Sequence, residues 1–193
     1  CLSALRREKW QDNVIRVLST VGIAVPGFVV ATSFMILFAV KLKLVPASGL
    51  SSAAAYVLPV VTLALSPCSY IARLMRSSML ETLNQDYIRT ARAKGISEGK
   101  VTRKHALRNA MLPVTTVIGL QLGSLLGGAV LTESVYAWPG IGNYTVQCIM
   151  KSDFPVVQGV VLLIAVIFVL MNLIVDVIYA FLDPRIKFEK KEV

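Results

Sequence analysis

The sequence LETLNQDYIRTARAKGISEGKVTRKHALRNAMLP, at residues 80–113, determines how the rest of the chain is interpreted. It carries seven Lys or Arg, and an eighth basic residue, Arg76, lies just upstream. On either side the chain is apolar over about the thickness of a bilayer. A basic segment between two apolar segments predicts a structured loop at a membrane surface, with a partner that accounts for its charge.

Helical periodicity predicts a short amphipathic helix in the first half of this loop. The residues of its predicted apolar face are Leu80, Leu83, Tyr87 and Ala91. Gly95 follows at a position where a helix end favours a residue with positive φ. A second helix is expected to begin near Ser97, with Glu98 in its first turn. The loop is therefore predicted to be a helix, a glycine turn and a second helix.

The basic charge of the loop has two interpretations. A solvated cytoplasmic loop could be held to anionic lipid by charge alone. Alternatively, the loop docks onto another protein, and this is favoured by the small residues Thr90, Ala91 and Ala93 beside Gly95. Small side chains let another protein surface approach the backbone, whereas attraction to lipid would need no glycine turn.

Three motifs carry a resemblance to a known family: TARAKG at residues 90–95, HALRNA at 105–110 and LP at 112–113. Together they resemble the cytoplasmic loop of ABC importer permeases, whose general signature is Glu-Ala-Ala followed by Gly and a later Leu-Pro. Thr90 stands at the Glu position, Arg92 at the second Ala, and Leu107-Arg108 where other branches have Leu-Pro. These departures resemble the dipeptide, oligopeptide and nickel branch, and the resemblance covers almost the whole chain.

The resemblance implies an all-α, type I ABC importer transmembrane fold in which residues 80–109 couple the permease to an ATPase. The implied coupling residues are Asp86, Tyr87, Ile88, Arg89, Thr90, Ala91, Arg92, Ala93, Lys94 and Gly95. The implied partners are two ABC ATPase subunits, a second related permease and an external substrate-binding protein. ATP and Mg²⁺ would bind to the ATPases, and no cofactor is expected on this chain.

Composition independently predicts an integral membrane protein. The 193 residues are 55% hydrophobic and 16% charged, with a mean hydropathy of +0.68 and a net charge of +9. Seventeen of the 20 Lys and Arg fall in residues 6–16, 73–108 and 185–191, a distribution that argues against nucleic-acid binding. The positive-inside rule places these three segments, and hence both ends, in the cytoplasm of a bacterial or archaeal cell, which requires an even number of spans.

Four spans are predicted, at residues 14–40, 53–75, 110–135 and 156–182, within one transmembrane domain over 1–193. Because Cys1 is not an initiator Met, we expect an N-terminally truncated chain with further helices upstream. Pro26-Gly27 predicts a kink in the first span, either for packing or to line a pathway. Outside the membrane, a short helix is expected over 141–150, and Tyr136, Trp138 and Tyr144 are predicted to form an interfacial aromatic belt.

Glycine and polar residues within the predicted spans suggest further contacts. A small-residue ridge for helix packing, which would also permit sliding, consists of Gly119, Gly123 and Gly127. Intramembrane polar contacts are expected from Gln121, Asn172 and Asp176. Asp176 has two interpretations, a structural hydrogen bond or ion pair near the cytoplasmic end and a proton relay, of which the structural one is favoured.

Enzymatic chemistry is not expected. The sequence has no phosphate-binding loop of the GxxxxGK[ST] type, one histidine, His105, and three scattered cysteines, so neither a nucleotide site nor a metal site is predicted. The predicted function is that of an ATP-driven importer permease for peptides or a related solute such as nickel. Two alternatives are an ion-gradient-driven transporter that uses Asp176 and a non-transporting membrane scaffold.

Overall fold

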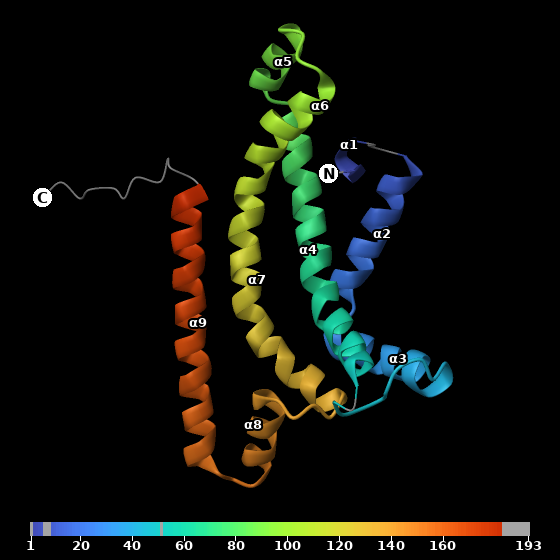
Figure 1. Cartoon of the computed structure of the whole chain (residues 1–193), viewed down its shortest axis with the longest axis vertical. Helices are drawn as coiled ribbons and strands as arrows, with labels where there is room; N and C mark the ends of the chain where they lie inside the picture. Colours follow the sequence, from blue (N-terminus) through green and yellow to red (C-terminus); the bar gives the residue numbers. More distant parts are fainter. Residues whose placement is uncertain (1, 6–8, 51, 183–193) are drawn as a thin grey trace, which may run out of the picture.

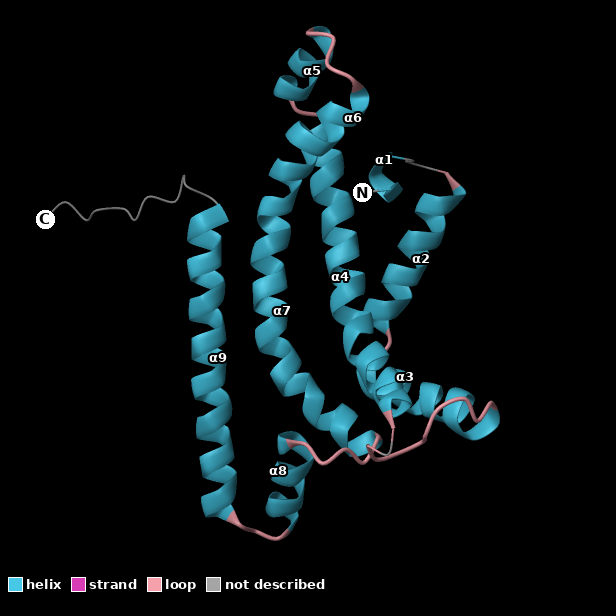
Figure 2. Cartoon of the chain, in the orientation of Figure 1, coloured by secondary structure: helices cyan, strands magenta, loops and turns pink. Residues whose placement is uncertain are grey.

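The computed structural model describes residues 2–5, 9–50 and 52–182, and every regular element in these ranges is a helix, as predicted (Figure 2). The α-helices are α1 (Leu2–Leu5), α2 (Trp10–Ala24), α3 (Gly27–Phe34), α4 (Val57–Leu83), α5 (Asp86–Ala93), α6 (Glu98–Lys100), α7 (Leu107–Val135), α8 (Ile141–Met150) and α9 (Phe154–Leu182). Two π-helical segments, η1 (Met35–Lys41) and η3 (Val101–Ala106), and one 3-10 segment, η2 (Ala53–Tyr56), adjoin them.

The long helices α4 and α7 pack side by side at the centre of the molecule (Figure 1). Helix α2 packs against α4, and α9 packs against α7 on the opposite side. Residues 84–106, which we call the protrusion, connect α4 to α7 at one end of the pair and contain α5, α6 and η3. The other end, where α3 and α8 lie, is called the far end (Figure 1).

Apolar helices of membrane-spanning length are present within the described residues. Ala53–Leu83 and Phe154–Ile174 are each long and apolar enough to cross a bilayer, and a third segment qualifies if α2 and α3 with η1 count as one span. Large apolar side chains of α9, including Leu162 and Val169, are exposed, which suits contact with lipid or another membrane helix. The number of spans in the membrane, four from the sequence, stays a prediction.

The predicted kink in the first span is a break in the structure. Helix α2 ends at Ala24, Val25 is extended, and α3 begins only after Pro26, so that the two helices are bent by 104°. The cause is local, because a residue before proline is disfavoured in the helical region. Residues 14–40 are therefore two helices that meet at nearly a right angle.

Candidate functional site: a basic protrusion between two long helices

The protrusion is shorter than the predicted coupling loop of residues 80–109. Helix α4 continues to Leu83 and α7 already begins at Leu107, so both ends of the predicted loop belong to the long helices. Gln85 has an extended backbone with ψ of 148°, and this residue redirects the chain before α5. Asp86 lies in the first turn of α5, where a negative charge interacts favourably with the helix dipole.

Gly95 ends α5 in the conformation predicted from the sequence, with φ of +74°. The Gly95 N–H donates to the Arg92 carbonyl at 2.9 Å, and the Ile96 N–H donates to the Ala91 carbonyl at 3.3 Å. These two bonds form a Schellman motif, which satisfies carbonyls at the helix end and requires a left-handed residue. As predicted, the next helix follows directly, with Ser97 at its N-cap position.

One face of α5 is fixed to the ends of α4 and α7. Ile88 is 0% exposed and Ala91 is 7% exposed. Their apolar cluster also contains Ala4, Met75, Met79, Val101, Ala106, Ala110 and Val114. Because these residues come from α1, α4, α5, η3 and α7, the protrusion is packed onto both long helices at once.

The predicted apolar face of the first helix is right at Ala91 and wrong at Tyr87, and the expected role of Ala91 at a partner surface is wrong. Tyr87 was placed on the buried face, but its side chain is 42% exposed and its hydroxyl accepts a hydrogen bond from Asn109 Nδ2 at 2.7 Å. Ile88 is buried in its place, because the turn at Asn84 and Gln85 interrupts the helical register that begins in α4. Ala91, expected to let a partner approach, instead packs inside the protein's own core.

The outer surface of the protrusion is basic. Its eight exposed members among the predicted coupling residues are Asp86, Tyr87, Arg89, Thr90, Arg92, Ala93, Lys94 and Gly95. Residues 84–106 contain six Lys or Arg, all exposed, against two acidic residues. Arg92 Nε is 2.8 Å from Glu98 Oε1, so one of the six spans the Gly95 turn in an exposed ion pair. The remaining excess of positive charge faces solvent and suits an acidic partner surface.

A buried ion pair that sequence reasoning missed lies at the base of the protrusion. Asp12 of α2 is 0% exposed and accepts two hydrogen bonds from Arg76 of α4, from Nε at 2.6 Å and from Nη2 at 2.7 Å. The hydroxyl of Ser3 also donates to Asp12. This bidentate geometry fixes α1 and α2 against the end of α4. The only sign of this ion pair in the sequence was the position of Asp12, an acidic residue directly before an apolar segment.

At the far end, Tyr136 joins three helical segments. The residue was predicted to lie in an interfacial aromatic belt, but it is 2% exposed. Its hydroxyl lies 3.0 Å from Thr62 Oγ1 of α4 and donates to the Ala31 carbonyl of α3 at 3.1 Å. Tyr136 is therefore a buried connector between the end of α7 and the neighbouring helices.

Glu133 fixes the start of α8 at the same end. It lies within α7, and its Oε2 accepts a hydrogen bond from the Asn143 N–H at 2.9 Å. A Cβ at Gly142 would lie 2.6 Å from the Val130 Cα, and one at Gly140 would clash with the Glu133 carboxylate. Because the atom next to Gly142 is backbone, this position requires glycine for the predicted helix 141–150 to approach α7 so closely, whereas a side chain at Gly140 would displace the Glu133 carboxylate.

The structure places the predicted intramembrane residues in different surroundings. Gly119 is buried on α7, whereas the surroundings of Gly123 and Gly127 and the side chain of Asp176 lie outside the described part. Gln121 lines a cavity of about 350 Å³ that also contacts α3 and α4. Asn172 donates to the Phe168 carbonyl of its own helix at 3.0 Å. The ridge and the Asp176 contact stay predictions.

Comparison with known proteins gives consistent results. The family described as "Binding-protein-dependent transport system inner membrane component" matches residues 1–188. The chain is similar to the dipeptide transport system permease protein DppB of Bacillus subtilis (strain 168), with 47% identity over 190 residues that cover 98% of this chain and 62% of the relative. The glutathione transport system permease protein GsiC of Escherichia coli (strain K12) is 42% identical over 188 residues, which cover 97% and 61%. The chain thus spans about three-fifths of the length of these relatives.

The solved inward-facing MetNI methionine ABC transporter has a similar fold. Its TM-score is 0.73 at 20% identity, and the match covers 94% of this chain and 82% of that chain. At this identity the likeness concerns the fold alone. It confirms the predicted all-α ABC importer transmembrane fold.

Proposed function

We propose, from the premise that the chain belongs to the family of binding-protein-dependent transport system inner membrane components, that it is part of a permease subunit of an ATP-driven importer. The proposed substrates are di- or oligopeptides or a related small solute such as nickel. Support for peptides comes from the relatives, whose names refer to dipeptide and glutathione transport.

The proposed role of the protrusion is to couple the permease to ATPase subunits. The observation that carries this role is its two-sided construction, with Ile88 and Ala91 anchored in the core of α4 and α7 and a basic, small-residue face left outside. That exposed face would sit in a cleft of one of two ABC ATPase subunits, which bind ATP and Mg²⁺. A second permease and an external binding protein would complete the assembly.

Alternating access gives this arrangement its mechanism. ATP on the ATPases and the loaded binding protein would each bind one state of the permease more tightly than the other, which is the only way a ligand shifts such an equilibrium. The protrusion and both chain ends are proposed to be cytoplasmic, in agreement with the distribution of Lys and Arg.

Charge reversal on the exposed face tests the coupling role. The double variant Arg89→Glu/Lys94→Glu changes two exposed residues and leaves the buried cluster intact. We expect the purified full-length permease to lose its co-purifying ATPase subunits and its ATP-driven transport in vesicles. The control Lys41→Glu/Lys151→Glu reverses two exposed charges outside the protrusion and should retain the ATPases.

The same assay distinguishes the alternatives. Retention of the ATPases and of transport in Arg89→Glu/Lys94→Glu would contradict the proposal. Transport driven by an ion gradient without ATP, and abolished by Asp176→Asn, would support the secondary transporter instead. No flux of solute under any energy source would support the scaffold.

A further inference from the structure

Two cavities meet along the α2–α4 interface, and their linings differ in kind. A groove of about 550 Å³ runs between α2, α3 and α4, and a cleft of about 450 Å³ lies nearer the protrusion. Ile15, Ser19 and Ala72 line both, so the groove and the cleft adjoin each other along the contact between α2 and α4.

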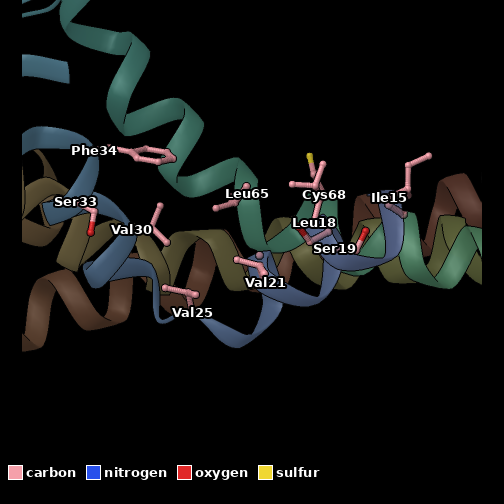
Figure 3. A pocket seen from close by; sticks show the side chains of 13 residues that line it. Ile15, Leu18, Ser19, Val21, Val25, Val30, Ser33, Phe34, Leu65 and Cys68 are labelled. Atoms are coloured by element: carbon pink, nitrogen blue, oxygen red, sulfur yellow. The ribbon is translucent and has the colours of Figure 1, made fainter. Parts of the chain in front are cut away.

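The groove is almost entirely aliphatic. Figure 3 shows Leu18 and Val21 of α2 near Leu65 of α4, with Val25, just after α2, and Val30 and Phe34 of α3 towards one end. Its few polar groups are small, such as Ser33 and Cys68. A peptide in this groove would leave most of its N–H and C=O groups without hydrogen bonds, which is costly away from water. A hydrocarbon chain has no such groups and suits this lining.

The cleft is basic and rich in hydroxyl groups. Arg16 of α2 and Arg73 of α4 line it together with Arg76 and the side chains of Thr20 and Ser77. Arg76 is engaged by Asp12, whereas Arg16 and Arg73 form no ion pair within the described residues. Two guanidinium groups that have no ion pair in the described part of the chain, beside hydroxyl donors, suit a phosphate.

The depth of the cleft matches the level of lipid headgroups. Arg73 lies 20 residues after Ala53, the start of an apolar segment that is long enough to span a bilayer. At about 1.5 Å per helical residue this distance is roughly 30 Å, the thickness of the hydrocarbon core. The groove then lies beside acyl chains and the cleft at the membrane surface.

We propose that the adjoining groove and cleft together bind an anionic phospholipid, with an acyl chain between α2, α3 and α4 and the phosphate at Arg16 and Arg73. The apolar groove matches the acyl chain and the basic cleft matches the phosphate. The cleft also lies nearer the predicted membrane surface, as the headgroup of a bilayer lipid does. Basic pockets between membrane helices on the cytoplasmic side are known to suit anionic headgroups. The proposal concerns binding and does not depend on the transport function.

Native mass spectrometry of the full-length protein in detergent tests the site. Dioleoyl phosphatidylglycerol is titrated against dioleoyl phosphatidylcholine, which has the same chains, and against inorganic phosphate and dihexanoyl phosphatidylglycerol. We expect the long-chain anionic lipid to bind roughly tenfold more tightly than the zwitterionic one, from two arginine contacts. Arg16→Gln/Arg73→Gln should remove this preference, and the control Lys41→Gln/Lys151→Gln, which also removes two charges, should keep it.

The acyl part of the site has a separate test. Leu18→Ser places a hydroxyl in the groove and should weaken binding of the dioleoyl lipid several-fold, with no change for the dihexanoyl lipid. An unchanged lipid preference in Arg16→Gln/Arg73→Gln would overturn the proposal, as would equal binding of inorganic phosphate and the long-chain lipid. A Leu18→Cys cross-link to another protein segment in native membranes would also overturn it, because protein would then fill the groove.

Discussion

The two ends of the α4–α7 pair are held by different sets of contacts. In the protrusion, apolar side chains around Ile88 pack inside and the charges of residues 84–106 lie outside, while the buried Asp12–Arg76 pair lies at its base. At the far end, an apolar cluster around Leu58 and Tyr136 also contains buried hydrogen bonds: the Tyr136 hydroxyl contacts Thr62, and nearby Glu133 accepts from the first turn of α8. Hydrophobic contact is non-directional, whereas hydrogen bonds need defined distances and angles. The far end therefore defines how the helices meet, and the protrusion end defines which face is presented outward.

Ile88→Ala should have the largest effect, because it removes the central contact of the apolar cluster in the protrusion. We expect the free energy of unfolding to fall by about 2–4 kcal/mol, with the protrusion affected most. Limited proteolysis within residues 84–106 and thermal unfolding measure it. Thr90→Ala on the exposed face of α5 is the control, and equal protease sensitivity of the two variants would show that Ile88 does not anchor the protrusion.

Tyr136→Phe should have the next largest effect, since it removes the hydroxyl that connects Thr62 and the Ala31 carbonyl at the far end. Leaving these buried groups without their partner should cost about 2 kcal/mol of unfolding free energy. Thermal unfolding of the purified protein measures it, with Tyr144→Phe, an exposed tyrosine, as the control. A midpoint equal to that of the parent protein would mean that this contact does not define the far end.

Gly95→Ala should cost about 1 kcal/mol, because a side chain is disfavoured at φ of +74° although open space surrounds the position. Gly95→Asn should cost less, since asparagine adopts this region more readily. Gly99→Ala is the matched control, because Gly99 has open space and no positive φ. Hydrogen exchange at the Ile96 amide reports on the turn, and equal exchange in all three variants would argue against the cap.

Arg92→Gln should have the smallest effect, because its ion pair with Glu98 is exposed on both sides. We expect the free energy of unfolding to fall by less than about 1 kcal/mol, and this difference from the parent protein should shrink as salt is added. Arg103→Gln, with a basic residue outside the pair, provides the comparison. A loss that persists at high salt would mean that Arg92 acts through packing and not through charge.

Local features were predictable from the sequence and long-range ones were not. Gly95 and Ser97 were placed correctly because a helix end depends on nearby residues. Tyr136 was misplaced because its partner Thr62 is 74 residues away, and the bond between Arg76 and Asp12 spans 64 residues. Helical periodicity carries no information about contacts between residues so far apart in the sequence. Tyr136 was therefore interpreted from its sequence neighbours alone, and the contact between Arg76 and Asp12 was missed.

The error at Tyr87 and Ile88 has a different physical origin. Periodicity was followed from α4 straight into α5, but the turn at Asn84 and Gln85 resets the register. Neither residue is a glycine or proline, which are the strongest sequence signals of a break. The prediction therefore placed Tyr87 on the buried face, where the structure has its neighbour Ile88.

The shared apolar cluster under α5 has a mechanical consequence. A load on the outer face of α5 reaches Met79 of α4 and Val114 of α7 through the same group of side chains. Because this cluster connects α5 to both long helices, a load on α5 is shared between them, and neither helix is expected to bend without the other. We therefore expect a displacement of α5 to tilt both long helices together.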